Sequence, residues 1–217
     1  MDQHHAWLAR VCIIVSTLFA SALRAQELSP DGAAEFALGL GYANVSLGSK
    51  SSIDSEGAFH FEPSLVFSPI QQLPQLRLGT DVGVTMVLDN STRTIISSGG
   101  TTIFRGSSDV PLWLLEPELR LSWRQYLGGD HIWFVEPGVG GGWAFGFLDL
   151  DSDDGSSYSK NDSTLFGRVF LRAGAKVQGG TFGFEASYLA GSNLDFGGDA
   201  SGDLNEFYIG IFGALAF

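Results

Sequence analysis

Cysteine, long apolar runs and positive charge are all scarce in this chain of 217 residues. Its one cysteine, Cys12, lies in an apolar stretch near the amino terminus that we predict is removed from the mature chain. A single cysteine excludes a disulfide within the chain, and we expect no thiol chemistry after its removal. No later apolar run reaches the roughly 20 residues that a membrane-spanning helix needs.

The charge balance is strongly acidic. Asp and Glu number 24 against 12 Lys and Arg, which gives a formal net charge of −12. An acidic chain of this kind repels phosphate groups, so we expect no nucleic-acid partner.

The amino-terminal segment has the pattern of a secretory signal peptide. Basic residues precede an apolar run at 11–22, and small residues then precede two candidate cleavage sites, after Ala22 and after Ala25. A transmembrane anchor is the alternative, but this run of about 12 residues is shorter than a spanning helix. We predict a signal peptide at residues 1–25 and one domain at residues 26–217.

Alternation of apolar and polar residues recurs along the rest of the chain, which is rich in glycine (29) and phenylalanine (17). A period of two is typical of β-strands, because successive side chains point to opposite faces. The alternating segments predict strands at residues 33–47, 57–68, 75–89, 112–124, 132–148, 164–178, 181–190 and 205–217. The fold class is therefore all-β, with eight strands expected and ten as the alternative.

The last of these strands is the most informative. One of its faces carries Phe207, Ile209, Ile211, Leu215 and Phe217. The last eleven residues hold no charge, and the chain ends on an aromatic residue. Such a strand is typical of the closing strand of a barrel in lipid.

The predicted connections alternate between long and short. The long ones are residues 48–56, 90–110, 149–163 and 191–204, and the short ones are 69–74, 125–131 and 179–180. Transmembrane barrels have short periplasmic turns and long extracellular loops. This rhythm predicts that both termini lie in the periplasm.

A soluble β-sandwich or a lipocalin-like barrel would show the same period, with its apolar faces turned inward. Here the charged faces also carry many Gly, Ala and Ser residues, which suits a narrow lumen better than a solvated surface. The opposite faces are large and apolar on every strand. We therefore predict an antiparallel up-and-down transmembrane β-barrel.

Taken together, the signal peptide, the alternating strands, the rhythm of connections and the closing strand resemble the small outer-membrane barrels, the group of OmpX, the OmpA barrel and OmpW. The resemblance covers residues 26–217. It implies a monomer in the bacterial outer membrane, in contact with lipid and lipopolysaccharide. It also implies folding by the barrel-assembly machinery, which reads the final strand, so the apolar face of that strand is the candidate assembly signal.

The inward faces of the predicted strands carry charges of both signs. A barrel of eight strands is filled by side chains, and buried charges need partners. We predict a lumen charge network of Glu62, Asp81, Glu116, Glu118, Arg120, Arg124, Glu136, Arg168, Arg172, Lys176 and Glu185. Glu35, Arg77 and Glu206 share these faces, and the two signs are near balance.

Hairpin register predicts particular pairs within this network. It places Glu136 near Arg120 and Arg124 on neighbouring strands. It places Glu185 between Arg172 and Lys176. A plugged lumen is the main interpretation, and a narrow polar path is the alternative.

Two histidines remain for catalysis after the predicted cleavage. His60 shares a strand face with Glu62 and Ser64, but side chains at this spacing lie in line about 7 Å apart, which is too far for a proton relay. His131 falls in a short turn. No nucleophile with an oriented base is evident, so we expect no enzyme and no cofactor.

The loops offer two weaker features. Asp149, Asp151, Asp153 and Asp154 are spaced closely enough to suggest a calcium site, although the EF-hand pattern fails and an acidic surface loop is the simpler interpretation. Residues 90–109 read as a hairpin protruding beyond the membrane. We expect a non-enzymatic barrel with a plugged lumen and external loops for surface interaction. A narrow channel or transporter for small or hydrophobic solutes is the second hypothesis, and a lipid-modifying enzyme is the third.

Overall fold

The computed structural model describes residues 34–48, 53, 56–70, 72–88, 93–96, 102–107, 111–129, 131–152 and 155–217. The predicted signal peptide lies outside these residues. The strands are β1 (Ala34–Ser46), β2 (Glu56–Phe67), β3 (Leu76–Val87), β4 (Arg93–Ile96), β5 (Thr102–Gly106), β6 (Leu112–Trp123), β7 (Gln125–Leu127), β8 (Trp133–Asp151), β9 (Ser157–Val177), β10 (Gly180–Asp195) and β11 (Ser201–Ala216). Among the residues described, no helix is both long and apolar enough to cross a membrane.

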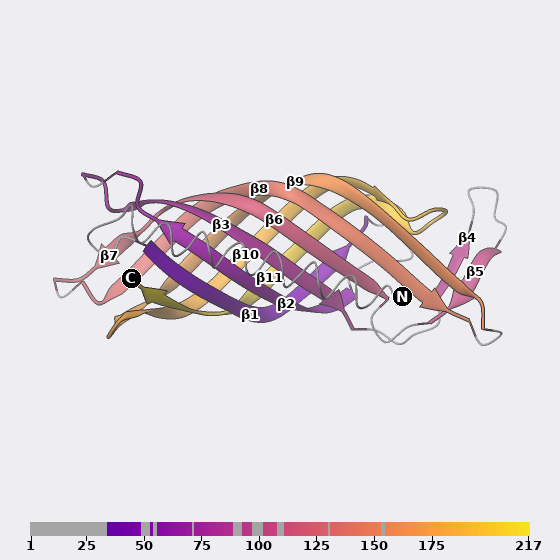
Figure 1. Ribbon diagram of the computed structural model, residues 1–217, viewed down its shortest axis with the longest axis horizontal. Coiled ribbons are helices and arrows are strands. Elements are labelled where there is room, and N and C mark those ends of the chain that lie inside the picture. The colour runs from indigo at the N-terminus through magenta and orange to yellow at the C-terminus, as the bar shows by residue number, and fades with distance from the viewer. Residues whose placement is uncertain are drawn as a thin grey trace.

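Eight of these strands close into a barrel (Figure 1). Each pairs antiparallel with its neighbours in the order β1, β2, β3, β6, β8, β9, β10 and β11. The barrel closes where β11 pairs with β1, and the Phe217 amide donates to the Ala34 carbonyl at 3.1 Å. Short β7 continues β6 and pairs with β8, while β4 and β5 form a separate hairpin. The predicted all-β, eight-stranded up-and-down barrel is confirmed.

The two ends of the barrel differ. The short turns, β7 and the carboxyl terminus lie at one end, which we call the turn end, and the β4–β5 hairpin lies at the other, which we call the loop end (Figure 1). At the loop end β8 and β9 run on to Asp151 and Ser157, although the sequence predicts a long loop over residues 149–163. Strands β10 and β11 likewise reach Asp195 and Ser201. The loops predicted at 149–163 and 191–204 are therefore mostly strand.

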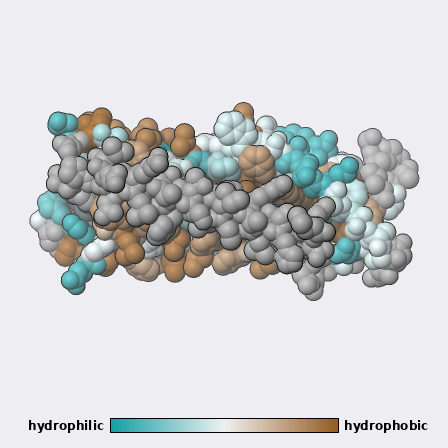
Figure 2. Space-filling model, in the orientation of Figure 1, coloured by the Kyte–Doolittle hydropathy of each residue, from teal (hydrophilic) through white to brown (hydrophobic). Residues whose placement is uncertain are grey.

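The outer face of the barrel is apolar. Leu119 and Leu215 are each 67% exposed, and Phe184 is 63% exposed. In Figure 2 hydrophobic residues line the upper and lower edges of the barrel's middle, while hydrophilic ones gather toward the loop end and at the opposite tip. A water-soluble barrel would bury such side chains, whereas a band of them on the outside suits lipid.

A run of glycines in β8 makes room inside the narrow barrel. A Cβ atom added to Gly138 would lie 2.3 Å from the Phe170 ring, and one on Gly140 would lie 2.9 Å from a carboxylate oxygen of Glu118. The glycines of β8 therefore leave space in the lumen for the large inward side chains of the neighbouring strands.

Candidate functional site

The lumen holds a buried network of charged side chains because one residue in two on each strand points inward. Its buried members are Glu35, His60, Glu62, Arg77, Asp81, Glu116, Glu118, Arg120, Arg124, Glu136, Arg168, Arg172, Glu185 and Glu206. They fall into three layers, which we number from the turn end.

The first layer joins two arginines to two glutamates. Arg124 donates from Nη1 to Glu35 Oε1 at 2.8 Å and from Nε to Glu136 Oε2 at 2.6 Å. Arg77 Nη2 lies 2.8 Å from Glu35 Oε2. The Arg124 guanidinium also lies 4.4 Å from the centre of the Phe134 ring, a cation–π contact. Each charge in this layer has an opposite partner.

The second layer centres on Arg120. This guanidinium contacts Asp81 and Glu118, lies 2.5 Å from Glu62 Oε2, and lies 3.1 Å from Glu185 Oε1. Arg172 adds a 2.6 Å hydrogen bond from Nε to Glu185 Oε2 and a 3.2 Å bond from Nη2 to Glu62 Oε1. Two arginines thus hold four carboxylates from four strands. Such an arrangement ties the barrel walls together across the lumen.

The third layer surrounds Arg168. This side chain lies 2.5 Å from Glu116 Oε2 through Nη2 and 2.9 Å from Glu118 Oε2 through Nε. Beside it, Thr85 Oγ1 lies 2.7 Å from His60 Nδ1 and 2.9 Å from Glu206 Oε2. His60, Glu116 and Glu206 offer ligand atoms that all lie within 4.8 Å of one another. Among the described residues, these three side chains are close enough together to bind one metal ion.

Ten of the eleven residues predicted for the lumen network lie buried in these layers. The exception is Lys176, which is exposed near the end of β9, so the prediction that it lines the lumen is wrong. The strand there has reached the turn, where a lysine can extend into water rather than be buried. Of the predicted pairs, Glu136 contacts Arg124, and Glu185 contacts Arg172. Arg120 pairs with other carboxylates instead of Glu136.

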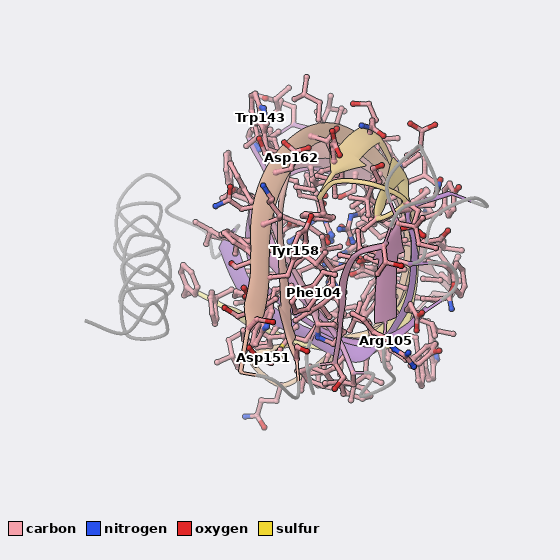
Figure 3. The ribbon with its side chains drawn as sticks, turned by 90° about the vertical axis from the view of Figure 1, so that its right-hand side faces the viewer. Phe104, Arg105, Trp143, Asp151, Tyr158 and Asp162 are labelled. Atoms are coloured by element: carbon pink, nitrogen blue, oxygen red, sulfur yellow. The ribbon has the colours of Figure 1, made fainter. Side chains whose placement is uncertain are left out.

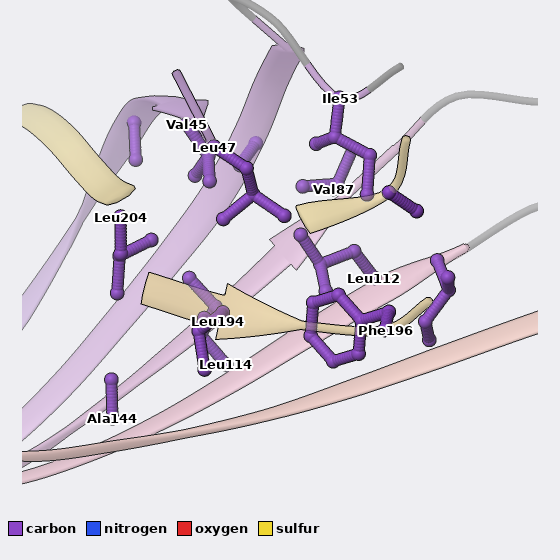
Figure 4. Packing of buried hydrophobic residues seen from close by; sticks show 14 of the residues in the cluster. Val45, Leu47, Ile53, Val87, Leu112, Leu114, Ala144, Leu194, Phe196 and Leu204 are labelled. Atoms are coloured by element: carbon purple, nitrogen blue, oxygen red, sulfur yellow. The ribbon is translucent and has the colours of Figure 1, made fainter. Parts of the chain in front are cut away.

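Above the third layer the interior becomes apolar. The cluster contains Ala43, Val45, Leu47, Ile53, Ala58, Val87, Ile95, Leu112, Leu114, Ala144, Leu148, Leu150, Phe166, Leu189, Leu194, Phe196, Ala200, Leu204 and Tyr208 (Figure 4). Its members continue the same inward positions that carry the charges nearer the turn end. In β1, for example, Glu35 faces inward near one end, and Val45 faces inward near the other. Sequence reasoning missed this apolar core.

The loop end of this cluster is covered by side chains from two hairpins. Phe104 of β5 stacks on Tyr158 of β9 with ring centres 5.5 Å apart, and both lie over the middle of the ring of strands (Figure 3). The Tyr158 hydroxyl donates to the Phe196 carbonyl at 2.5 Å. Ile95 is buried to 1% exposure. The hairpin predicted over residues 90–109 is present in its described part, where β4 pairs with β5, and its Ile95 and Phe104 side chains pack over the barrel mouth.

The other predicted site residues lie apart from one another. Asp149 and Asp151 are exposed on the outer face of β8, while Asp153 and Asp154 lie outside the described residues. His131 is exposed in the turn with a φ of 52°. The candidate assembly signal forms one outward face, on which Phe207, Ile209, Ile211 and Leu215 are exposed and Phe217 is half-buried.

Comparisons with known proteins find similarity to this chain among solved structures of barrels. No model of a protein family matches the chain, and no curated protein matches it. The solved structure of Neisserial surface protein A is 12% identical, with a TM-score of 0.58 over 85% of this chain and 97% of that chain. The chain has the fold of the small outer-membrane β-barrels. That assignment agrees with the predicted group of OmpX, the OmpA barrel and OmpW.

Two further solved structures have lower scores. The amino-terminal barrel of Pseudomonas aeruginosa OprF is 12% identical, with a TM-score of 0.44 over 85% of this chain and 98% of that chain. Yersinia pestis Ail is 12% identical, with a TM-score of 0.47 over 84% of this chain and 96% of that chain. The fold assignment depends on the first comparison and on the apolar outer face.

Proposed function

We propose that this protein is a non-enzymatic, monomeric outer-membrane barrel with a sealed lumen. Its external loops and hairpins would form a surface for interaction with partners. The observation that supports this proposal is the burial of side chains along the lumen. Three layers of charged side chains lie buried nearer the turn end, and the apolar cluster lies buried nearer the loop end. A lumen without an open path leaves the loop end as the place where the protein meets partners.

The proposed orientation places both termini and the short turns in the periplasm. It is supported by the position of Ala34 and Phe217 together at the turn end, opposite the extended hairpins. Transmembrane barrels place short turns inside and long connections outside. The apolar face of β11 would then contact lipid and serve as the signal for the barrel-assembly machinery, and the loop end would meet lipopolysaccharide.

Cysteine labelling on intact cells tests which end is outside. Ser159 and Gln178 are both exposed, at the loop end and the turn end respectively. We expect a membrane-impermeant maleimide to label Ser159→Cys on intact cells, and Gln178→Cys only after the outer membrane is permeabilised. Labelling of Gln178→Cys alone on intact cells would reverse the orientation and refute an external role for the hairpins.

The narrow channel or transporter remains the second hypothesis, because charged side chains line the lumen. The burial of Arg120, Arg168 and Arg172 among carboxylates argues against it, since ions would have to break these pairs to pass.

The lipid-modifying enzyme is the third hypothesis. His60 and Ser64 are buried in the lumen, at 0% and 2% exposure, where a lipid at the outer face cannot reach them. We expect no lipid mass change when the protein is expressed. A mass shift that His60→Ala abolishes would restore this hypothesis.

A further inference from the structure

The buried charges of the lumen do not balance. Among the described residues, eight buried carboxylates meet five buried arginines, which leaves an excess of three negative charges when every carboxylate is ionised. The first layer is neutral, since Glu35 and Glu136 meet Arg77 and Arg124. The whole excess therefore falls on the second and third layers. Buried charge without compensation is costly, so the excess calls for either another positive charge or bound protons there.

The shortage is sharpest around Thr85. Its single hydroxyl lies 2.9 Å from Glu206 Oε2, 3.3 Å from Glu116 Oε1 and 2.7 Å from His60 Nδ1. A hydroxyl has one proton to donate, so it can serve only one of the two carboxylates at a time. The group contains more acceptors than it has protons to satisfy them.

Two buried atoms in this group make no hydrogen bond, although one of them, His60 Nε2, lies 3.5 Å from Glu62 Oε2. They are Glu206 Oε1 and His60 Nε2, in side chains that are 1% and 0% exposed. Glu206 Oε1 lies 3.4 Å from His60 Nδ1 and 4.0 Å from the nearest arginine nitrogen, so it points into the group. Buried polar atoms without partners are uncommon in folded proteins and call for an explanation.

We propose that His60, Glu116 and Glu206 bind one divalent transition-metal ion inside the barrel. Their ligand atoms lie within 4.8 Å of one another. Ligands of a tetrahedral zinc ion, bonded at about 2.0–2.2 Å, lie about 3.3–3.6 Å apart, so side-chain rotations that draw these atoms together by about 1 Å bring all three into range. Arg168 holds Glu116 through Oε2, which leaves Oε1 facing Thr85.

The donor set selects the class of metal. An imidazole nitrogen favours ions such as Zn²⁺ over Ca²⁺ or Mg²⁺, which prefer oxygen ligands alone. A divalent ion cancels two of the three excess negative charges, whereas a proton shared between Glu116 and Glu206 cancels one. The ion would also join β2, β6 and β11 across the lumen. This inference is independent of what the loop end binds.

Metal analysis of the purified protein tests the proposal. The mature chain, without the predicted signal peptide or a polyhistidine tag, is unfolded, freed of metal with a chelator and refolded in detergent with Zn²⁺. After gel filtration, we expect one zinc ion per chain by mass spectrometry of the elements. Refolding with Ca²⁺ or Mg²⁺ alone should leave no retained ion. Folding is checked by the heat-dependent shift in gel mobility that closed barrels show.

Matched variants separate ligands from charge. Glu206→Gln and His60→Gln each remove one ligand, whereas Glu185→Gln removes a buried carboxylate of the second layer without touching the group. We expect zinc to fall to background in the first two and to remain at one per chain in the third. If either ligand variant does not fold, Glu116→Gln replaces it.

Three results would overturn the proposal. Wild-type protein refolded with Zn²⁺ but free of the metal would show that protons neutralise the lumen. Equal zinc in all variants would place the metal elsewhere, for example on the exposed Asp149 and Asp151. Loss of zinc from Glu185→Gln as well would show that retention follows total charge rather than these ligands.

Discussion

Arg120 shows how a single buried side chain can organise this protein. Its guanidinium contacts four carboxylates, Glu62, Asp81, Glu118 and Glu185, and also lies 4.7 Å from the centre of the Phe170 ring. A buried ion pair often stabilises a protein no more than well-packed apolar residues would. Removal of one partner is nevertheless strongly destabilising, because it leaves the other charge buried without compensation. Loss of Arg120 would therefore leave buried carboxylates on several strands without a partner.

Replacement of Arg120 tests this role. We expect Arg120→Met to lower the free energy of unfolding by about 3–5 kcal/mol, because it leaves carboxylates buried without a partner. Lys176→Met is the matched control, since Lys176 is exposed, and a surface charge contributes about 0–1 kcal/mol. Urea unfolding in detergent measures both. Equal stability of the two variants would show that the buried carboxylates do not need the Arg120 charge.

At the scale of the elements, the pairing of β1 with β11 is where the barrel closes. Gly41 and Gly210 face each other across this pair, and the Tyr208 ring lies over both. A Cβ atom on Gly41 would lie 2.3 Å from the Ile209 carbonyl oxygen and 2.6 Å from Cε2 of Tyr208. The two glycines thus leave room for the Tyr208 ring to pack against the β1–β11 pair from inside the barrel.

A methyl group at this closure should therefore be poorly tolerated. We expect Gly41→Ala to destabilise the barrel by about 1–3 kcal/mol through overpacking. Gly213→Ala, in the same strand pair, is the control, because nothing lies within 4 Å of a Cβ atom added there. Thermal unfolding followed by gel mobility compares them. A larger loss in Gly213→Ala would contradict the packing of Tyr208 across this closure.

Sequence patterns predict the barrel well where the membrane imposes them. Phe36, Leu38 and Leu40 alternate with Glu35 and Ala37, and this contrast predicted both the strand and its lumen side. Individual ion pairs depend on register across strands, which is why Glu136 could be placed near two arginines but not assigned to one.

The pattern fails beyond the lipid. At the loop end of β1, Asn44 and Ser46 lie on the outer face, while Val45 and Leu47 are buried inside. The outer face there meets water, so the protein is packed like a soluble domain, and the hydrophobic face has changed sides. Period-two alternation does not mark this exchange. Residues 149–151 and 157–163 were therefore predicted as loop, although they form β8 and β9.

At the scale of the whole molecule, one barrel joins two kinds of interior. The part nearer the turn end has an apolar exterior and a charged interior, and the part nearer the loop end has a hydrophobic core under a polar exterior. The sealed lumen that we propose would depend on ion pairs in the first part and on apolar packing in the second. Phe104 and Tyr158 then cover the mouth.

Single-channel recording in a planar bilayer tests the sealed barrel most directly. The protein is first shown to be folded by a heat-dependent shift on a gel and is then added to the bilayer. We predict membrane insertion without discrete conductance steps, because no ion can cross both the paired charges and the apolar cluster. Reproducible steps from the folded wild-type protein would contradict the account and make the inward Arg and Glu side chains the walls of a channel.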